Sequence, residues 1–252
     1  MPISSIDEVV LTLRSIVEEC RQKQSKAGFF AALYLRMTEA VKEGISNHQF
    51  ENAKLMEQLD ICFAERYISA YQAYGAKQKC TRSWKLTFDS CGNNDNIVLQ
   101  HLLMGINTHI NLDLAIAAAT VAPGESIHRL EKDFNRINDI IATLSDDVQE
   151  CLTKIWFPMR LVTRIMNGKQ EAVLNFSITK ARQTSWANAV LLANMIEVQK
   201  LSYIDSMDSM VEKVGRAIQS PGFWINILLK LIRRTEYNNI SRTITLIETI
   251  KV

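Results

Sequence analysis

The most unusual hydrophobic pattern in the chain lies between residues 97 and 122. Most of this segment is Leu, Ile, Ala, Val, Met and Gly, so a helix built from it can be buried on nearly every face. The polar loop at 91–96 precedes it, and Asp95 or Asn96 can cap its first turn. Pro123 and Gly124 end it. The pattern predicts a buried central helix around which the other segments pack.

Polar residues interrupt this apolar segment at helical spacing. A helix of 3.6 residues per turn brings residues four apart onto one face, with a drift of about 40°. Because an unpaired buried amide or imidazole costs about 1–3 kcal/mol, each of these side chains needs a partner. The central helix is therefore where we expect unusual chemistry. One stripe holds His101, His109 and Asp113, with Thr108 beside His101, and a second stripe holds Gln100, Asn107 and Asn111.

The flanking chain has the spacing of amphipathic helices separated by short breaks. Ser4 and Ser5 precede an apolar-periodic run with acidic residues in its first turn, which is typical of a helix start. Two short segments, 83–90 and 242–252, fit a helix or a strand equally well. Further helices are predicted at 26–43, 50–74, 127–144 (capped by Ser126), 171–200, 205–219 and 223–233. Helix after helix with short connections predicts one all-α domain over residues 1–252, a bundle around the central helix.

Composition narrows the class of protein. The 252 residues are 47% hydrophobic and 22% charged, as in an ordinary globular protein, and the net charge of +2 gives no case for a nucleic-acid partner. The five cysteines form no CxxC pair, which favours a reducing compartment. The first residues lack the basic and apolar regions of a signal peptide. Segment 97–122 is long enough to span a membrane, but its two histidines and one aspartate would be costly in lipid. We therefore predict a cytoplasmic protein with no membrane partner.

Several segments resemble a bacterial family catalogued only as a domain of unknown function. The most specific is QHLLMGINTHINLDLAIAAA at 100–119, and FFAALYLRMTEAV at 29–41 and MEQLDICFAERYISA at 56–70 also take part. RSWKLTF at 82–88 and DFNRINDII at 133–141 complete the resemblance, which covers roughly residues 28–220. The resemblance implies a helical fold and carries no established activity.

His109 and Asp113 form the main candidate site. They are four residues apart, so their side chains meet on a regular helix. Such a pair can share a divalent metal, here zinc, manganese or iron, or the carboxylate can orient the imidazole as a general base. His101 lies about 12 Å away along the helix axis and cannot ligate the same ion unless the helix breaks at Gly105. Any metal would need another carboxylate, for which Asp60 is our choice over Glu65, Asp133 and Asp139. The alternative interpretation is a hydrogen-bond network that only fixes packing.

Other polar clusters leave two interpretations open. Asp60 and Tyr67 are seven apart and share a face, so they can face a pocket, or Asp60 can pair with an arginine such as Arg66 and join two helices. Arg182 is four residues before Trp186, which suits a cation–π pair or an anion clamp.

Two further patterns lie between residues 146 and 164. Arg160 and Arg164 are also four apart. DDVQE at 146–150 has the DDxxE spacing of all-α terpene synthases, but it directly follows Ser145 at a predicted helix start, where acids complement the helix dipole. We therefore do not interpret DDVQE as a metal motif.

The leading hypothesis is an enzyme with a buried helical pocket that performs metal-assisted hydrolysis of a small molecule. His109, Asp113 and His101 are its predicted catalytic residues, and His109, Asp113 and Asp60 its predicted metal ligands. The competing hypotheses are a non-catalytic small-molecule binding protein and a purely structural polar network. The sequence leaves the substrate and the oligomeric state open. The predicted substrate-binding residues are Asn107, Asn111, Tyr67 and Gln100.

Overall fold

The computed structural model describes residues 3–141, 169–236 and 238–250, and these contain helices and no strand. The all-α prediction is confirmed. DDVQE at 146–150, Arg160 and Arg164 lie outside the described residues. The helices are α1 (Ile6–Gln22), α2 (Ala27–Ser46), α3 (Ala53–Gly75), α4 (Arg82–Ser90), α5 (Val98–Thr108), α6 (Leu114–Val121), α9 (Lys169–Asn194), α10 (Glu197–Gln219), α11 (Phe223–Thr235) and α12 (Ile240–Glu248), with a π-helical turn η1 (His109–Asp113) and a 3₁₀ helix η2 (Gly124–Leu130).

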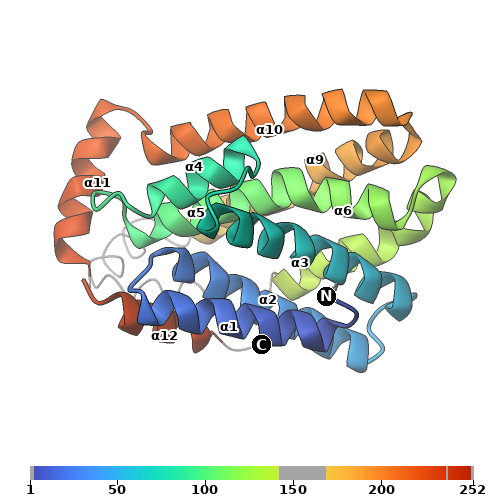
Figure 1. The fold of residues 1–252 in the computed structure, drawn as a ribbon, viewed down its shortest axis with the longest axis horizontal. Coiled ribbons are helices and arrows are strands. Elements are labelled where there is room, and N and C mark those ends of the chain that lie inside the picture. The colour runs from blue at the N-terminus through green and yellow to red at the C-terminus, as the bar shows by residue number, and fades with distance from the viewer. Residues whose placement is uncertain (1–2, 142–168, 237, 251–252) are drawn as a thin grey trace.

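The central helix is the continuous run α5–η1–α6, close to the predicted 97–122. Figure 1 shows α1, α2 and α12 on one side of it and α10 along the other. Two apolar cores meet on this helix. Its first half packs with α1, α2, α3, α4 and α12, and its second half packs with α3, η2, α9 and α10.

The central helix would also suit a membrane span by its length and composition. Val98–Val121 is the one helix among the described residues that is long and apolar enough to cross a bilayer, and 78% of its most apolar window is buried inside the protein. Such burial is what a core helix of a globular protein also shows.

The starts of α1 and α5 differ in how they are capped. The Ser5 side chain accepts a hydrogen bond from the Glu8 backbone N–H at the start of α1, as its sequence predicts. At the start of α5 the predicted cap is wrong: Ile97 holds the N-cap position, and Gln100 Oε1 accepts from the Ile97 N–H at 3.0 Å.

Tertiary packing decides the two ambiguous segments. Segment 83–90 is helical in α4 and residues 242–248 of the tail are helical in α12, because each helix buries one face against the bundle. Thr243, Ile244 and Ile247 form that face on α12.

Two predicted helices differ from the structure. The helix predicted at 171–200 ends at Asn194, and a new helix that begins at Glu197 takes in the predicted 205–219. The helix predicted from 127 starts instead as the 3₁₀ turn η2, with α-helical residues at 131–141. Ser126 does not cap it, because its hydroxyl donates to the Pro123 carbonyl at 2.6 Å.

Candidate functional site

The central helix changes its winding at the candidate residues. His109–Asp113 is a π-helical turn, in which the Leu114 N–H donates to the His109 carbonyl five residues back. A π turn holds one residue more than an α turn, so the helix faces before and after it are rotated relative to each other. Both predicted catalytic residues of the pair therefore lie in the one irregular turn of this helix.

Asp113 accepts hydrogen bonds from three directions. Arg66 Nε on α3 lies 2.9 Å from Asp113 Oδ1, Trp84 Nε1 on α4 lies 2.8 Å from Oδ2, and His109 Nδ1 lies 3.1 Å from Oδ2. The Asp113 side chain is 1% exposed, whereas that of Arg66 is 28% exposed. Arg66 thus pairs with Asp113 and not with Asp60, and the interaction joins three helical segments.

The state of His109 follows from these contacts. Burial, partly opposed by the hydrogen bond to Asp113, lowers the pKa of His109 below its ordinary value, so the ring is neutral at pH 7. Since Asp113 can only accept, His109 Nδ1 carries the proton and Nε2 carries a free lone pair. Nε2 is buried and has no hydrogen-bond partner within the described part of the chain.

Aromatic rings fix the orientation of the imidazole. Phe63 stacks on it with ring centroids 3.6 Å apart and planes 9° from parallel, and Tyr34 meets it edge-on at 4.3 Å. Phe30, Tyr67 and Trp84 complete the surround at centroid distances of 5.8, 6.1 and 6.0 Å. The ring is therefore held by packing as well as by its bond to Asp113.

His109 lines a cavity of about 100 Å³, called here the His109 cavity. This volume is several times what one water needs. Its walls come from α2, α3, the central helix, residues 137 and 141, and α9. Most of the lining is aliphatic or aromatic, including Leu33, Met37, Phe63 and Ile110. Its polar lining residues are Tyr34, Thr38, Asp60, His109 and Arg182.

Four of these five residues present what we call the open polar atoms. They are Tyr34 Oη, Thr38 Oγ1, Asp60 Oδ2 and His109 Nε2, buried atoms that find no hydrogen-bond partner of good geometry among residues 3–141, 169–236 and 238–250. The Tyr34 and Thr38 hydroxyls are close enough to interact with each other. Burial, with a smaller contribution from the charge of Glu57, raises the pKa of Asp60 to about 7. Desolvation also raises the pKa of Tyr34. Burial therefore disfavours the charged forms of Asp60 and Tyr34 in this mostly apolar lining.

Arg182 is the cation of this cavity. Its Nε donates to Asn138 Oδ1 at 2.6 Å, its Nη2 donates to the Phe134 carbonyl at 2.5 Å, and its guanidinium lies 4.5 Å over the Phe134 ring. The predicted stack on Trp186 is therefore a stack on Phe134. Burial lowers the pKa of Arg182 to about 10, which leaves it charged at pH 7.

The structure brings only part of the predicted site together. His109 and Asp60 line one cavity, and Asp113 lies behind His109 rather than in that lining. Among the described residues, no three His, Cys, Asp or Glu side chains are close enough to hold a metal ion. Both oxygens of Asp113 already accept hydrogen bonds, so the donor set of His109, Asp113 and Asp60 does not fit a metal centre.

The predicted substrate-binding amides contact α10 and do not line the His109 cavity. Gln100 Nε2 donates to the carbonyls of Ile218 and Gln219 at 2.9 and 3.2 Å. Asn107 Nδ2 donates to the Val211 carbonyl at 3.0 Å, and Asn111 Nδ2 donates to Asn107 Oδ1 at 3.1 Å. Gln100 and Asn107 therefore attach the central helix to α10, and Asn111 supports the Asn107 side chain.

The remaining predicted residues lie elsewhere. His101 packs edge-on against Phe29, at a ring distance of 5.9 Å, in a separate cavity. Tyr67 is buried among aromatic rings outside the cavity lining. Asp133, one of the alternative carboxylates for a metal, accepts hydrogen bonds from the backbone N–H groups of Glu51 and Asn52 at 2.8 Å each and so holds the start of α3.

Sequence reasoning missed Tyr34, Thr38 and Phe63 as site residues. Each sits in an ordinary apolar helical stripe, and no spacing in the sequence relates α2 and α3 to His109. A buried hydroxyl on such a stripe, as at Thr38, is the one sequence feature that could have pointed to the cavity.

The molecule is thus an all-α protein with a buried His–Asp pair beside an apolar cavity. The chain belongs to a family of unknown function (DUF5995), whose model matches residues 6–221. This agrees with the resemblance drawn from the central-helix motif. The chain matches no curated protein and no solved structure.

Proposed function

We propose that the protein binds a small, mostly apolar molecule in the His109 cavity and recognises it through a hydrogen-bond donor that reaches His109 Nε2. The observation that carries this proposal is that four residues lining one apolar cavity each carry a buried polar atom without a hydrogen-bond partner among the described residues. Each buried polar atom left unpaired costs about 1–3 kcal/mol. A ligand that pairs with them recovers part of that cost, which a fully packed structural network would not need.

The shape of the cavity limits the ligand. About 100 Å³ accepts a compact molecule, and the aliphatic and aromatic walls favour an apolar body. Neutral His109 accepts a hydrogen bond, and the hydroxyls of Tyr34 and Thr38 donate or accept. Asp60, with a pKa of about 7, donates in its protonated form, and Arg182 adds a positive charge at the wall.

A matched pair of probes tests this recognition. Phenol carries an O–H donor on an apolar ring, and toluene has a similar shape without the donor. We expect phenol to bind about fivefold more tightly in calorimetric titrations, because a net hydrogen bond contributes about 1 kcal/mol. His109→Phe keeps a flat ring against Phe63 and leaves Asp113 two donors, so it should bind both probes equally.

His128→Phe is the control for this experiment, because it makes the same replacement at a half-exposed side chain outside the cavity. It should keep the preference for phenol. If the unmodified protein binds neither probe, or binds both with the same affinity, the proposed recognition is wrong.

The His109–Asp113 arrangement favours a second candidate function, general-base catalysis. A carboxylate that fixes the Nδ1–H tautomer and stabilises the imidazolium is the arrangement that activates a hydroxyl or a water at Nε2. Metal-assisted hydrolysis stays a prediction from the sequence, and the donor set described above does not support its metal. Hydrolysis of p-nitrophenyl acetate by the purified protein, compared with His109→Phe, tests the base: equal rates would remove this candidate.

A further inference from the structure

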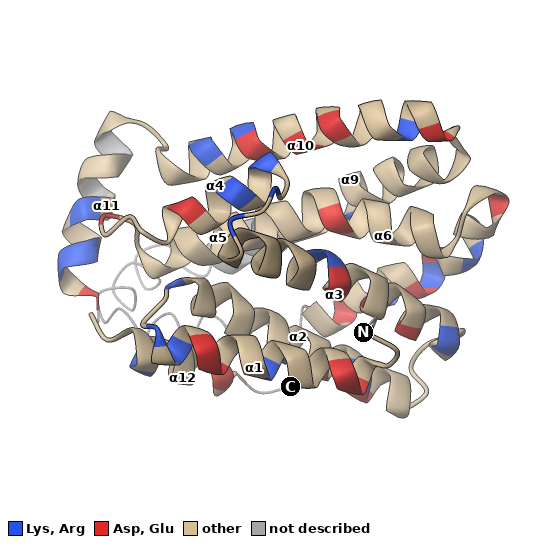
Figure 2. Ribbon diagram, in the orientation of Figure 1, with Lys and Arg blue, Asp and Glu red and all other residues tan. Residues whose placement is uncertain are grey.

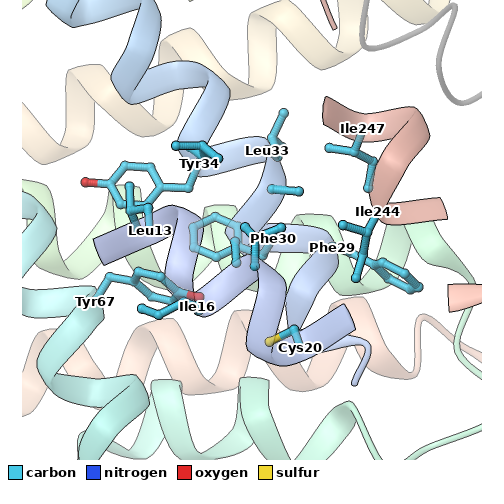
Figure 3. Close-up of a cluster of buried hydrophobic side chains, with 14 of the residues drawn as sticks. Leu13, Ile16, Cys20, Phe29, Phe30, Leu33, Tyr34, Tyr67, Ile244 and Ile247 are labelled. Carbon is cyan, nitrogen blue, oxygen red and sulfur yellow. The ribbon is translucent and has the colours of Figure 1, made fainter. Parts of the chain in front are cut away.

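A second cavity lies beside His101, at the end of the molecule where α5 begins and α11 ends. It has a volume of about 530 Å³, and we call it the His101 cavity. His101 and His109 are about 12 Å apart along the helix, so the two cavities are distinct. Phe29 and Phe30 are neighbours on α2; Phe29 lines the His101 cavity and Phe30 lines the His109 cavity. Figure 3 shows the two side chains pointing apart, Phe29 toward Ile244 and Phe30 toward Tyr67.

Three cations line the His101 cavity, and the acid present neutralises them poorly. Lys26 is 8% exposed, and its ammonium donates only to uncharged oxygens, those of Asn93 at 2.7 Å and Asn94 at 2.9 Å. Arg233 on α11 likewise donates to the Asn94 carbonyl at 2.9 Å. Arg234 is exposed and forms no ion pair within the described chain. A buried ammonium such as that of Lys26 is costly without an ion-pair partner, so this cavity favours an anion. The basic bands on α11 mark this end in Figure 2.

Glu236 is the acidic residue that lines the cavity. Both of its oxygens accept from the Val98 N–H at 3.2 Å, at the N-terminus of α5, and its nearest approach to Arg233 is 3.9 Å. Three cations against one carboxylate leave two positive charges in the lining. Burial raises the pKa of Glu236 to about 7, although the Val98 N–H at this helix N-terminus and the nearby Arg233 and Lys26 partly oppose the shift, so the carboxyl neutralises the cations only in part.

Two residues that line the His101 cavity carry buried nitrogen atoms without partners. His101 is 4% exposed, and both of its ring nitrogens lack a hydrogen-bond partner in the described segments. The same holds for Asn96 Nδ2, whose residue is also 4% exposed. Burial, with the positive charges of Lys26 and Arg233, lowers the pKa of His101 to about 3, so its ring is neutral and has one N–H to donate. These donors need an acceptor that no described residue supplies.

We propose that the His101 cavity binds a phosphate group, either as free phosphate or carried by a small organic molecule. Two guanidinium groups and an ammonium match the charge and the several acceptor oxygens of phosphate better than the single charge of a carboxylate. The His101 and Asn96 N–H groups supply neutral donors to the remaining oxygens. The volume of about 530 Å³ leaves room for an organic substituent.

Titration of the full-length protein with inorganic phosphate tests the proposal, with sodium chloride added to keep the ionic strength constant. We expect saturable heat release and a rise in Tm. Lys26→Met should weaken binding more than tenfold, because it removes a buried charge-assisted donor. Arg234→Gln changes an exposed side chain that the fold does not need, and should weaken binding roughly two- to fivefold.

Arg129→Gln on η2 is the matched control, since it removes an exposed arginine that does not line the cavity. It should bind phosphate as the unmodified protein does. Tighter binding of glycerol 3-phosphate than of phosphate would identify an organic phosphate as the ligand, and equal binding would identify free phosphate. Each would support the proposal.

Three results would overturn it: no saturable binding of phosphate, the same loss in Arg129→Gln as in Arg234→Gln, or acetate binding as tightly as phosphate. NMR signals of the His101 ring add an independent readout. They should shift on phosphate addition in the unmodified protein and in Arg129→Gln, and unchanged signals at saturating phosphate would contradict the assigned donor.

Discussion

Asp60 should make the stability of this protein strongly dependent on pH. The unfolded chain releases its proton near the ordinary pKa of 3.8, whereas the folded protein holds the proton until about pH 7, chiefly because the carboxyl is buried. The stability that this group contributes is therefore complete below pH 3.8 and is lost as the pH rises through 7. A difference of about three pKa units corresponds to roughly 4 kcal/mol at about 1.4 kcal/mol per unit.

Asp60→Asn removes this dependence because the amide is neutral at every pH and close in size to the protonated carboxyl. Between pH 4 and pH 8 the variant should gain up to roughly 4 kcal/mol of unfolding free energy relative to the unmodified protein. Urea unfolding at intervals of half a pH unit measures this, and taking the difference between the two proteins cancels the other titrating groups.

Asp139→Asn is the control for this measurement, since that carboxyl is 67% exposed in a surface ion pair. Its effect should stay within a few tenths of a kcal/mol and show little change with pH. If Asp60→Asn and the unmodified protein have parallel stability profiles from pH 4 to pH 8, Asp60 is not a buried protonated carboxyl and the polarity assigned to the His109 cavity is wrong.

Two further substitutions test how the central helix is held. Arg66→Gln leaves buried Asp113 without its cation. Because Arg66 is partly exposed, we expect the free energy of unfolding in urea to fall by about 2 kcal/mol. An unchanged free energy would mean that the pair contributes nothing to stability. Gly105→Ala would place a Cβ 2.3–2.9 Å from side-chain atoms of Phe30 and should lower the free energy of unfolding by about 1–3 kcal/mol or more. Gly75→Ala is the control, because no atom of the described residues lies within 4 Å of its new Cβ, and it should be neutral. Equal Tm values for the two variants would refute the close packing of α2 on α5.

Hydrophobic periodicity was sufficient for the class of fold and for the central helix. An apolar run of 24 residues with Pro and Gly after it leaves few options other than a buried helix, and the structure has one at Val98–Val121. The pairing of His109 with Asp113 followed from the same period, because residues four apart meet on a helix whatever surrounds them. Local pattern therefore determined what lies within one element.

Tertiary structure decided everything that joins two elements. The π-helical turn has no sequence feature that announces it, and the sequence could not assign Arg66 to Asp113 rather than to Asp60. Gln100, Asn107 and Asn111 were predicted to bind substrate, but Gln100 and Asn107 donate to backbone carbonyls of α10, and Asn111 donates to Asn107. Hydrogen bonds and cavities depend on which helices pack together, and that depends on side-chain fit across long sequence separations rather than on spacing along the chain.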